Sequence, residues 1–369
     1  MCRLAAITSA EYISPMEPVL ALETMKEGHD GSGLGIMMKD LGGEFEGLKG
    51  YPILSGICSD QGLETVDHYM ETHGFKVRHV WTPAIREVHG IRRRDHYFAK
   101  VYQYPESYLD RPHPDKEDLL MRTRLELRRL GQEDESIIVF SFYPDVLAVK
   151  EVGDPLEVSE FFGLDNSSVK AKIIMAQGRQ NTNYAINLYA CHPFFIQGFS
   201  TMTNGENTAF VPIREYLTSR GCPGYTGYNS DSEVFTHILH YLMRQLGYPL
   251  TYYKHVITPL KTSEIAQRPD REVLDLLRKS LRMLCIDGPN CVIGFTPDGT
   301  CFMVQDSKKL RPGMVGGLKG KYALMSEECG VDKAVPQRDR SKDIFPMKYD
   351  TVIISPGAQE VTVWNQLHS

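Results

Sequence analysis

Two spacings of apolar residues along the chain predict an alternation of buried strands and amphipathic helices. Short apolar runs, which are typical of strands inside a core, lie at 2–9, 36–38, 136–142, 146–151 and 172–176. Apolar residues with a helical repeat predict helices at 18–25, 62–73, 117–130, 211–220, 231–246 and 271–284. Alternating apolar and polar positions then return, punctuated by a Pro-Asp-Gly turn at 297–299. Strands at both ends of the chain around central helices predict an α+β fold in which sheets are layered with helices.

The same pattern predicts a single domain over residues 2–365, with an insert at about 50–135. No internal repeat or low-complexity linker divides the sequence. Within the domain, the helix expected from 231 onward is preceded by Ser230, and Glu233 follows three residues later, which is the spacing of a capping box.

The composition is that of a globular protein without a nucleic-acid or membrane surface. The 369 residues are 42% hydrophobic and 24% charged, which is enough for a sizeable core. The net charge of -6 is spread without long runs of one sign, and the densest basic stretch, at 92–94, is expected to be a solvated loop. No apolar run approaches the roughly 18 residues that span a bilayer, and no signal peptide is evident. We therefore expect a cytoplasmic protein whose ligands are small acids.

Eight cysteines are expected to be reduced thiols in that compartment. None forms a Cys-x-x-Cys pair of the kind that holds zinc, so no metal site is predicted. Cys285, Cys291 and Cys301 are close enough in sequence to raise the question of an iron–sulfur cluster, but the apolar sequence around them favours buried structural thiols.

Cys2 becomes the first residue of the chain if Met1 is removed, as methionine aminopeptidase does before small residues. Processing would then leave a free α-amine and a thiol on one residue. An α-amine has an unperturbed pKa of roughly 7.7 to 8.0, so it can accept the thiol proton directly or through a water. The alternative is that Cys2 is an incidental small residue after the initiator.

Three further positions carry the groups that an enzyme acting on the side-chain amide of glutamine needs. Such an enzyme must hold a free amino acid by both charged ends and must aim donors at the developing oxyanion. Arg179 follows an expected strand, Asn204-Gly205 is expected in a turn, and Asp231 at the start of a helix. Each also has a structural alternative, namely a surface ion pair for Arg179, a type I′ turn for Asn204-Gly205 and a helix cap for Asp231.

Together with Cys2, these residues resemble the class II (N-terminal cysteine) glutamine amidotransferases. That family has Cys at the mature N-terminus, a glycine-rich Asp turn, an Arg loop, an Asn-Gly pair and an Asp before a helix, and all five occur here in that order. The family's Arg loop, roughly His-Thr-Arg-x-x-Thr, corresponds to QGRQNT at 177–182. Cys-His-Pro at 191–193 follows where the family often has a small residue, His or Gln, and Pro. The family's His-Asn-Gly is Thr-Asn-Gly at 203–205, and its Thr/Ser-Asp-Ser-Glu/Ala is Ser-Asp-Ser-Glu at 230–233.

Within class II the likeness is closest to the amidotransferase domain of glutamate synthase, over residues 2 to about 360. The turn HDGSGL at 29–34 is similar to the Gly-Asp-Gly-Ala-Gly-Ile turn of that enzyme, and the segments IDGP (286–289), KKLRP (308–312) and MSEE (325–328) also look like it.

The resemblance implies a four-layer αββα sandwich of the N-terminal nucleophile hydrolase type, and it implies a glutaminase. The sulfur of Cys2 would attack the side-chain carbonyl of glutamine. The Asn204 side chain and the Gly205 backbone N–H would form the oxyanion hole. Ammonia would leave first, and water would then cleave the thioester to glutamate.

The resemblance also assigns the substrate contacts. Arg179 would bind the α-carboxylate, Asp231 would bind the α-ammonium group, and Thr182 would help to shape the pocket. Two positions depart from the family, because Gln177 stands where the Arg loop has His and Thr203 where His precedes Asn-Gly. Neither His is the nucleophile or an oxyanion donor, so the departures concern how the Arg loop is braced and how tightly glutamine binds.

A split glutamate synthase is the assembly that the resemblance implies. This chain would carry no cofactor, and it would pass ammonia to a synthase subunit that holds a flavin and an iron–sulfur cluster and forms glutamate from 2-oxoglutarate. One alternative is a glutaminase subunit of another amidotransferase, such as an N-methylglutamate synthase-like enzyme. The other is a catalytically silent glutamine-binding subunit, which the two lost histidines and the absence of a synthase domain motivate.

Overall fold

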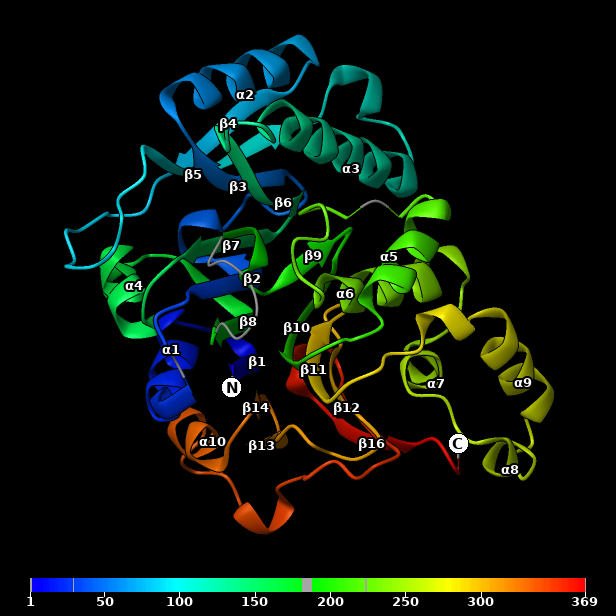
Figure 1. The fold of residues 1–369 in the computed structure, drawn as a ribbon. Coiled ribbons are helices and arrows are strands. Elements are labelled where there is room, and N and C mark those ends of the chain that lie inside the picture. Colours follow the sequence, from blue (N-terminus) through cyan, green and yellow to red (C-terminus); the bar gives the residue numbers. More distant parts are fainter. Residues whose placement is uncertain (1, 29, 181–187, 223, 369) are drawn as a thin grey trace.

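The computed structural model describes residues 2–28, 30–180, 188–222 and 224–368, and within them the strands form three antiparallel sheets (Figure 1). The first sheet has the order β13-β14-β1-β8-β2-β7. Its strands are β1 (Arg3–Ile13), β2 (Leu34–Gly42), β7 (Val146–Glu151), β8 (Lys170–Gly178), β13 (Met314–Leu318) and β14 (Lys321–Met325). The mixture of antiparallel sheets and helices agrees with the α+β prediction.

The second sheet has the order β16-β15-β12-β11-β10-β9. Its strands are β9 (Phe194–Ile196), β10 (Phe199–Gly205), β11 (Asn290–Phe295), β12 (Cys301–Gln305), β15 (Asp350–Ile354) and β16 (Val361–Asn365). Short β9 covers only the first part of β10, because their pairing ends at Thr201 and Phe194. The rest of β10 therefore needs other partners along that edge.

The first two sheets share one hydrophobic core. Residues of β1 and β8, such as Ile7 and Ile174, belong to the same buried cluster as Met202, Ile293 and Met303 of the second sheet. Leu4 to Ile7 are all at most 2% exposed, so β1 is buried on both faces and is a continuous apolar run rather than an alternating one. This explains why the sequence at 2–9 carries no period-two signal.

Helices cover the other face of each of these sheets. On the first sheet, α1 (Met16–Glu23) contacts β1 and β8, and α10 (Glu328–Ala334) contacts β14. On the second sheet, a separate apolar cluster joins strand residues such as Val292 and Phe302 to α5 (Phe210–Ser219), α6 (Glu233–His240) and α7 (Tyr253–Ile257).

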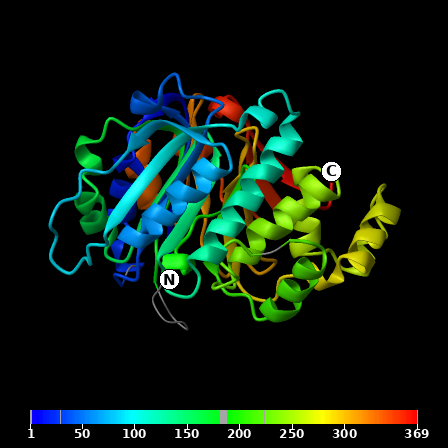
Figure 2. The ribbon, with the colours of Figure 1, turned by 90° about the horizontal axis from the view of Figure 1, so that it is seen from above.

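A third sheet, of order β4-β5-β3-β6, occupies the top of the molecule in Figure 1. It consists of β3 (Pro52–Cys58), β4 (Lys76–Trp81), β5 (His96–Gln103) and β6 (Ile137–Pro144), with the helices α2 (Asp60–Thr72) and α3 (His113–Leu130). The turned view shows α2 and α3 side by side (Figure 2). The backbone N–H of Ala148 on β7 donates to the Ser55 hydroxyl of β3 (3.3 Å), which ties this sheet to the first. The single domain with an insert at about 50–135 stays a prediction.

The expected helices are present, with shifts at their ends. The segments 18–25, 62–73, 117–130, 211–220, 231–246 and 271–284 correspond to α1, α2, α3, α5, α6 and α9 (Arg271–Ser280). Beyond His240 the chain forms a π-helical turn at 241–245, and a 3₁₀ turn follows α9 at 282–284. The sequence did not predict the short helices α4 (Pro155–Phe161), α7, α8 (Thr262–Ile265) and α10. No helix in the described ranges is both long and apolar enough to cross a bilayer.

Candidate active site

Three strand ends of the first sheet meet at one place. In the antiparallel register Arg3 of β1 pairs with Gly178 of β8, and Gly178 also pairs with Leu34 of β2. The residue before β1 is Cys2, and the residue after β8 is Arg179, whose backbone N–H donates to the Gly33 carbonyl (2.8 Å). The pairing thus places the thiol, the guanidinium and the glycine-rich turn at the same end of the sheet.

The Cys2 residue is partly exposed, and its thiol contacts one residue of the Arg loop. The backbone N–H of Gln180 donates to Cys2 Sγ (3.3 Å), and the thiol faces the Gln180 carbonyl oxygen (3.5 Å). Burial raises the pKa of the Cys2 thiol, although the Gln180 N–H and the charge of Arg179 act in the opposite direction. The resting thiol is therefore protonated at neutral pH, and a base must remove its proton before the sulfur can attack.

The glycine-rich turn packs closely against the segment that follows the Arg loop. Gly33 has φ +143°, and a Cβ there would lie 2.7 Å from Cys191 Sγ, so no side chain fits. The Asp30 carboxylate accepts from the Ser32 backbone N–H (3.0 Å), which holds the turn in shape.

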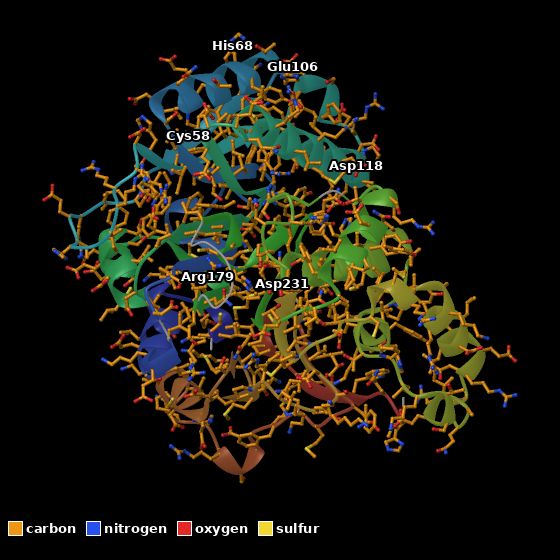
Figure 3. All side chains as sticks on the ribbon, viewed as in Figure 1. Cys58, His68, Glu106, Asp118, Arg179 and Asp231 are labelled. Atoms are coloured by element: carbon orange, nitrogen blue, oxygen red, sulfur yellow. The ribbon has the colours of Figure 1, made fainter. Side chains whose placement is uncertain are left out.

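Arg179 is buried although it stands outside a strand. Its exposed fraction is 8%, so the surface ion pair considered as an alternative is wrong. Its positive charge acts on the thiols of Cys2 and Cys191 and on His192, which places the guanidinium among these groups. Figure 3 shows Arg179 in the middle of the molecule, away from Cys58 and His68 of the third sheet's region. Its role as a substrate ligand stays a prediction.

Asn204 and Gly205 do not form the turn that the sequence predicted. They are the last two residues of β10 and pair with Cys291 and Asn290 of β11. Gly205 approaches the neighbouring backbone closely, because a Cβ there would lie 2.2 Å from the Pro289 carbonyl oxygen. Asn204 is 2% exposed, and its Nδ2 has no hydrogen-bond partner among the residues that the structure describes. A buried donor without a partner is costly in a folded protein.

Other buried polar atoms near Asn204 in sequence or joined to its strand also have no hydrogen-bond partner among the described residues. In the described part of the chain they include Gln177 Oε1, Thr203 Oγ1 and Asn207 Nδ2.

Asp231 is tied to the segment that follows β10. Its Oδ2 accepts from the Asn207 backbone N–H (2.8 Å), and the Ser232 hydroxyl donates to Oδ1 (3.4 Å). Burial raises the pKa of the Asp231 carboxyl, while the Asn207 N–H and the Ser232 hydrogen bonds oppose the rise. A half-buried carboxylate at this position can accept a cationic group.

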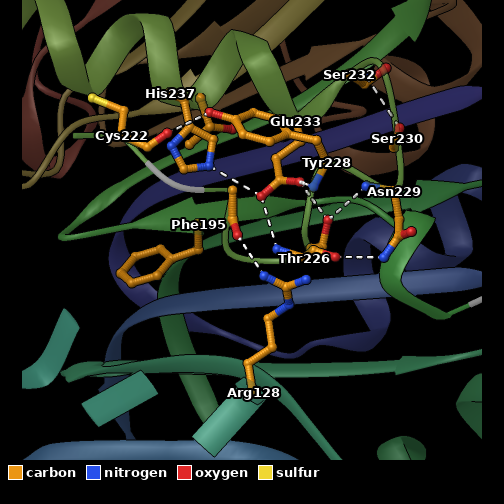
Figure 4. A network of polar contacts seen from close by, with 12 residues as sticks. Arg128, Phe195, Cys222, Thr226, Tyr228, Asn229, Ser230, Ser232, Glu233 and His237 are labelled. Carbon is orange, nitrogen blue, oxygen red and sulfur yellow. Dashed lines mark hydrogen bonds and ion pairs between the residues drawn. The ribbon is translucent and has the colours of Figure 1, made fainter. Parts of the chain in front are cut away.

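The predicted capping box at 230–233 is absent. The residue before α6 is Ser232, and its side chain makes no cap hydrogen bond. The Glu233 carboxylate instead accepts from the backbone N–H groups of Thr226 (3.0 Å) and Tyr228 (2.9 Å) and lies 3.1 Å from His237 Nε2 (Figure 4). These contacts fix the loop before α6, on which Asp231 lies.

Glu233→Gln is expected to lower the free energy of unfolding by about 2 kcal/mol, because an amide cannot accept all the donors that a buried carboxylate accepts here. Although burial disfavours the charge, the hydrogen bonds from His237 and Thr226 hold the pKa of Glu233 below its usual range. Urea denaturation of both proteins measures the difference. Glu215→Gln, on the exposed Glu215, is the matched control, with an expected change within about 0.5 kcal/mol. Equal stability of Glu233→Gln and wild type would contradict the role given to this carboxylate.

The five predicted residues within the described ranges fall into two groups. Cys2 and Arg179 lie at the same end of the first sheet, and the segment after Asn204-Gly205 reaches Asp231 through Asn207. The Gln177 side chain on β8 joins the two groups, because it donates to the Thr203 carbonyl oxygen (2.9 Å). Thr182 lies outside the described residues. Sequence reasoning missed the contributions of Gln180 and Asn207, because both act through backbone N–H groups, for which a sequence carries no signal.

The described part of the chain contains no cluster of side chains suited to binding a metal ion. There, no three His, Cys, Asp or Glu side chains lie close enough together to hold a metal ion. Cys285, Cys291 and Cys301 are each free, and burial raises the pKa of Cys291 and of Cys301 to about 12. Such thiols stay protonated and are poor ligands and nucleophiles.

The solved structures to which this chain is similar include two of low sequence identity. One is the glutamine phosphoribosylpyrophosphate (PRPP) amidotransferase from B. subtilis complexed with ADP and GMP, at 14% identity and a TM-score of 0.46. The other is described as the allosteric regulatory enzyme of purine biosynthesis, at 13% identity and a TM-score of 0.47. Each similarity covers 99% of this chain, which spans 49% of either structure. No family model and no curated protein matches the sequence.

Proposed function

We propose that this chain hydrolyses the side-chain amide of glutamine with Cys2 as nucleophile, as class II glutamine amidotransferases do. The observation that supports the proposal most directly is that Cys2 and Arg179 lie at one end of the first sheet, and that Gln177, two residues before Arg179, donates to the Thr203 carbonyl oxygen beside Asn204. Among the described residues the Asn204 amide nitrogen has no hydrogen-bond partner. The shared core between the six-stranded sheets and the helices on each outer face support the four-layer αββα arrangement of N-terminal nucleophile hydrolases.

The first half-reaction forms a thioester. With Met1 removed, the α-amine of Cys2 takes the thiol proton and the sulfur bonds to the glutamine carbonyl carbon. The carbonyl oxygen becomes an oxyanion, and Asn204 Nδ2 and the Gly205 N–H donate to it. The proton held by the amine passes to the leaving nitrogen, the C–N bond breaks, and ammonia departs. In the second half-reaction water gives a proton to the Cys2 α-amine and attacks the thioester carbonyl carbon, the C–S bond breaks, and the sulfur takes up that proton as glutamate is released.

Glutamine is held by its two charged ends. The buried Arg179 guanidinium pairs with the α-carboxylate, and the half-buried Asp231 carboxylate pairs with the α-ammonium group. Because both partners are shielded from water, each pair is stronger than an exposed ion pair.

An intact-mass measurement tests the nucleophile and its processing together. The purified protein is expected to lack Met1 and to gain one adduct when treated with a glutamine-mimicking electrophile, and peptide mapping should locate it at Cys2. Active protein that retains Met1, or an adduct at another residue, would refute the proposal.

Glutamine binding is expected to weaken as the pH falls through the raised pKa of Asp231. The ionised carboxylate pairs with the ammonium group, so binding is complete above that pKa and is lost below it. Burial raises the pKa, so the loss begins at a higher pH than for an ordinary aspartate. Measurement of KM for glutamine between roughly pH 4 and 7 tests this. Asp231→Asn should give a high KM with little dependence on pH over that range, and a comparable KM in wild type and variant would remove Asp231 from the pocket.

The acceptor of the ammonia is proposed from the sequence resemblance. In a split glutamate synthase of the cytoplasm, a separate synthase subunit with a flavin and an iron–sulfur cluster would use the ammonia to form glutamate. Co-purification of the native chain, followed by identification of the partner's cofactors, tests this step. A partner without those cofactors would assign the chain to another amidotransferase.

A further inference from the structure

Gln177 and Thr203, the two residues that replace family histidines, contact each other. The Gln177 side chain on β8 donates through Nε2 to the Thr203 carbonyl oxygen on β10 (2.9 Å). Both residues are at most 2% exposed. This hydrogen bond joins the strand that leads to Arg179 with the strand that carries Asn204, so it connects the two sheets at the site itself.

The other backbone group of Thr203 has an equally specific partner. Its N–H donates to Nδ1 of His192 (2.9 Å), another buried residue. Pairing with β9 ends at Thr201, so without His192 and Gln177 both backbone groups of Thr203 on this edge would be buried and unpaired. The two side chains take the place of a neighbouring strand.

His192 is kept neutral and in one tautomer. Burial, with help from the charges of Arg179 and Lys150, holds the pKa of His192 well below its usual range. An acceptor at Nδ1 requires the proton to be on Nε2. The segment that carries His192 is also anchored, because Lys150 Nζ donates to the carbonyl oxygens of Cys191 (2.6 Å) and Pro193 (2.8 Å).

We infer that His192 and Gln177 are positioning residues that hold the Thr203 backbone, and thereby aim Asn204 Nδ2 at the carbonyl attacked by Cys2. The inference rests on the proposed function, and it adds the residues that set the geometry of the oxyanion hole. It also gives Gln177, one of the two departures from the family, a structural role, since its side chain bridges the two strands through the backbone of residue 203. The hydrogen bonds of Gln177 and His192 to Thr203 support the oxyanion donors. Their loss should therefore lower kcat for glutamine hydrolysis more than it changes KM.

Two substitutions of His192 test whether its role is to accept the hydrogen bond from the Thr203 N–H. In His192→Asn the side-chain oxygen can take the place of Nδ1, whereas His192→Leu has nearly the same volume and no acceptor. For His192→Leu we expect kcat for glutamine hydrolysis to fall roughly 10- to 100-fold while KM stays within about twofold. His192→Asn should recover a large part of kcat. A residue that merely stabilises the fold would lower the fraction of active protein, so kcat is expressed per Cys2 thiol that reacts with a glutamine-mimicking electrophile. For such a residue kcat per reactive thiol would stay at the wild-type value.

Amide hydrogen exchange of Thr203 provides a readout that does not depend on catalysis. The Thr203 N–H should be protected in wild type and in His192→Asn and should exchange faster in His192→Leu. Gln177→Met provides an independent variant if His192→Leu fails to fold, and it should reproduce the fall in kcat. Protection that is unchanged in His192→Leu, or a rise in KM with kcat intact in both variants, overturns the inference. A wild-type protein that neither hydrolyses glutamine nor reacts at Cys2 overturns the proposed function instead, and the exchange data separate the two failures.

Discussion

Replacing Cys2 with alanine is expected to lower glutamine hydrolysis by at least roughly 10⁴-fold, because the reaction loses its nucleophile and no thioester can form. Alanine is also a small residue, so Met1 should still be removed and the α-amine should remain. The loss would therefore report on the sulfur alone. Steady-state ammonia release, with acid-quenched protein examined for a thioester by mass, measures both effects.

The same substitution should leave the fold intact. Cys2 is partly exposed, and the contacts it loses are those with Gln180. We therefore expect a change in the free energy of unfolding below about 1 kcal/mol. Cys285→Ala is the matched control, since Cys285 is also a partly exposed free thiol but belongs to the region after α9. Hydrolysis that survives in Cys2→Ala and falls in Cys285→Ala would contradict the assignment of the nucleophile.

The sequence predicted the residue types of the site better than their surroundings. Arg179 was expected after a strand, and it follows β8 directly. Its proximity to Cys2, however, follows from the pairing of Arg3 with Gly178, two residues that the sequence pattern cannot relate. Such a register is set by which faces of the two strands are buried, and that is decided by the whole sheet.

The turn predicted at Asn204-Gly205 shows how tertiary contacts override local preference. The polar run from 203 to 208 has the composition of a turn. Yet β10 continues to Gly205, because β11 pairs along one edge while Gln177 and His192 satisfy Thr203 on the other. Strand propensity depends strongly on such neighbours.

The helix predictions were accurate where a long apolar repeat existed. For α3, the expected 117–130 became His113–Leu130, an extension at one end only. The helix α8 has four residues and offers no repeat to detect. The capping-box prediction was wrong for a different reason. The Glu233 carboxylate accepts from the backbone N–H groups of Thr226 and Tyr228, which lie outside its helix, instead of from the start of that helix.

Asn204→Ala is expected to lower kcat for glutamine hydrolysis by about 10²- to 10³-fold, which is the cost of removing one oxyanion donor. KM should change little, because Arg179 and Asp231 still hold the two ends of glutamine. The free energy of unfolding should also change little, since Asn204 Nδ2 has no hydrogen-bond partner to lose among the described residues. Initial rates over a range of glutamine concentrations separate kcat from KM.

Asn204→Asp makes the test sharper, because aspartate keeps the shape of asparagine and replaces the donor with a negative charge where negative charge develops. Its kcat should fall below that of Asn204→Ala, whereas a residue that only fills space would tolerate aspartate at least as well as alanine. Asn365→Ala, on the edge strand β16 of the same sheet, is the control and should keep wild-type rates. A higher KM with unchanged kcat in both Asn204 variants would mean that this side chain binds ground-state glutamine, and the oxyanion hole would have to lie elsewhere.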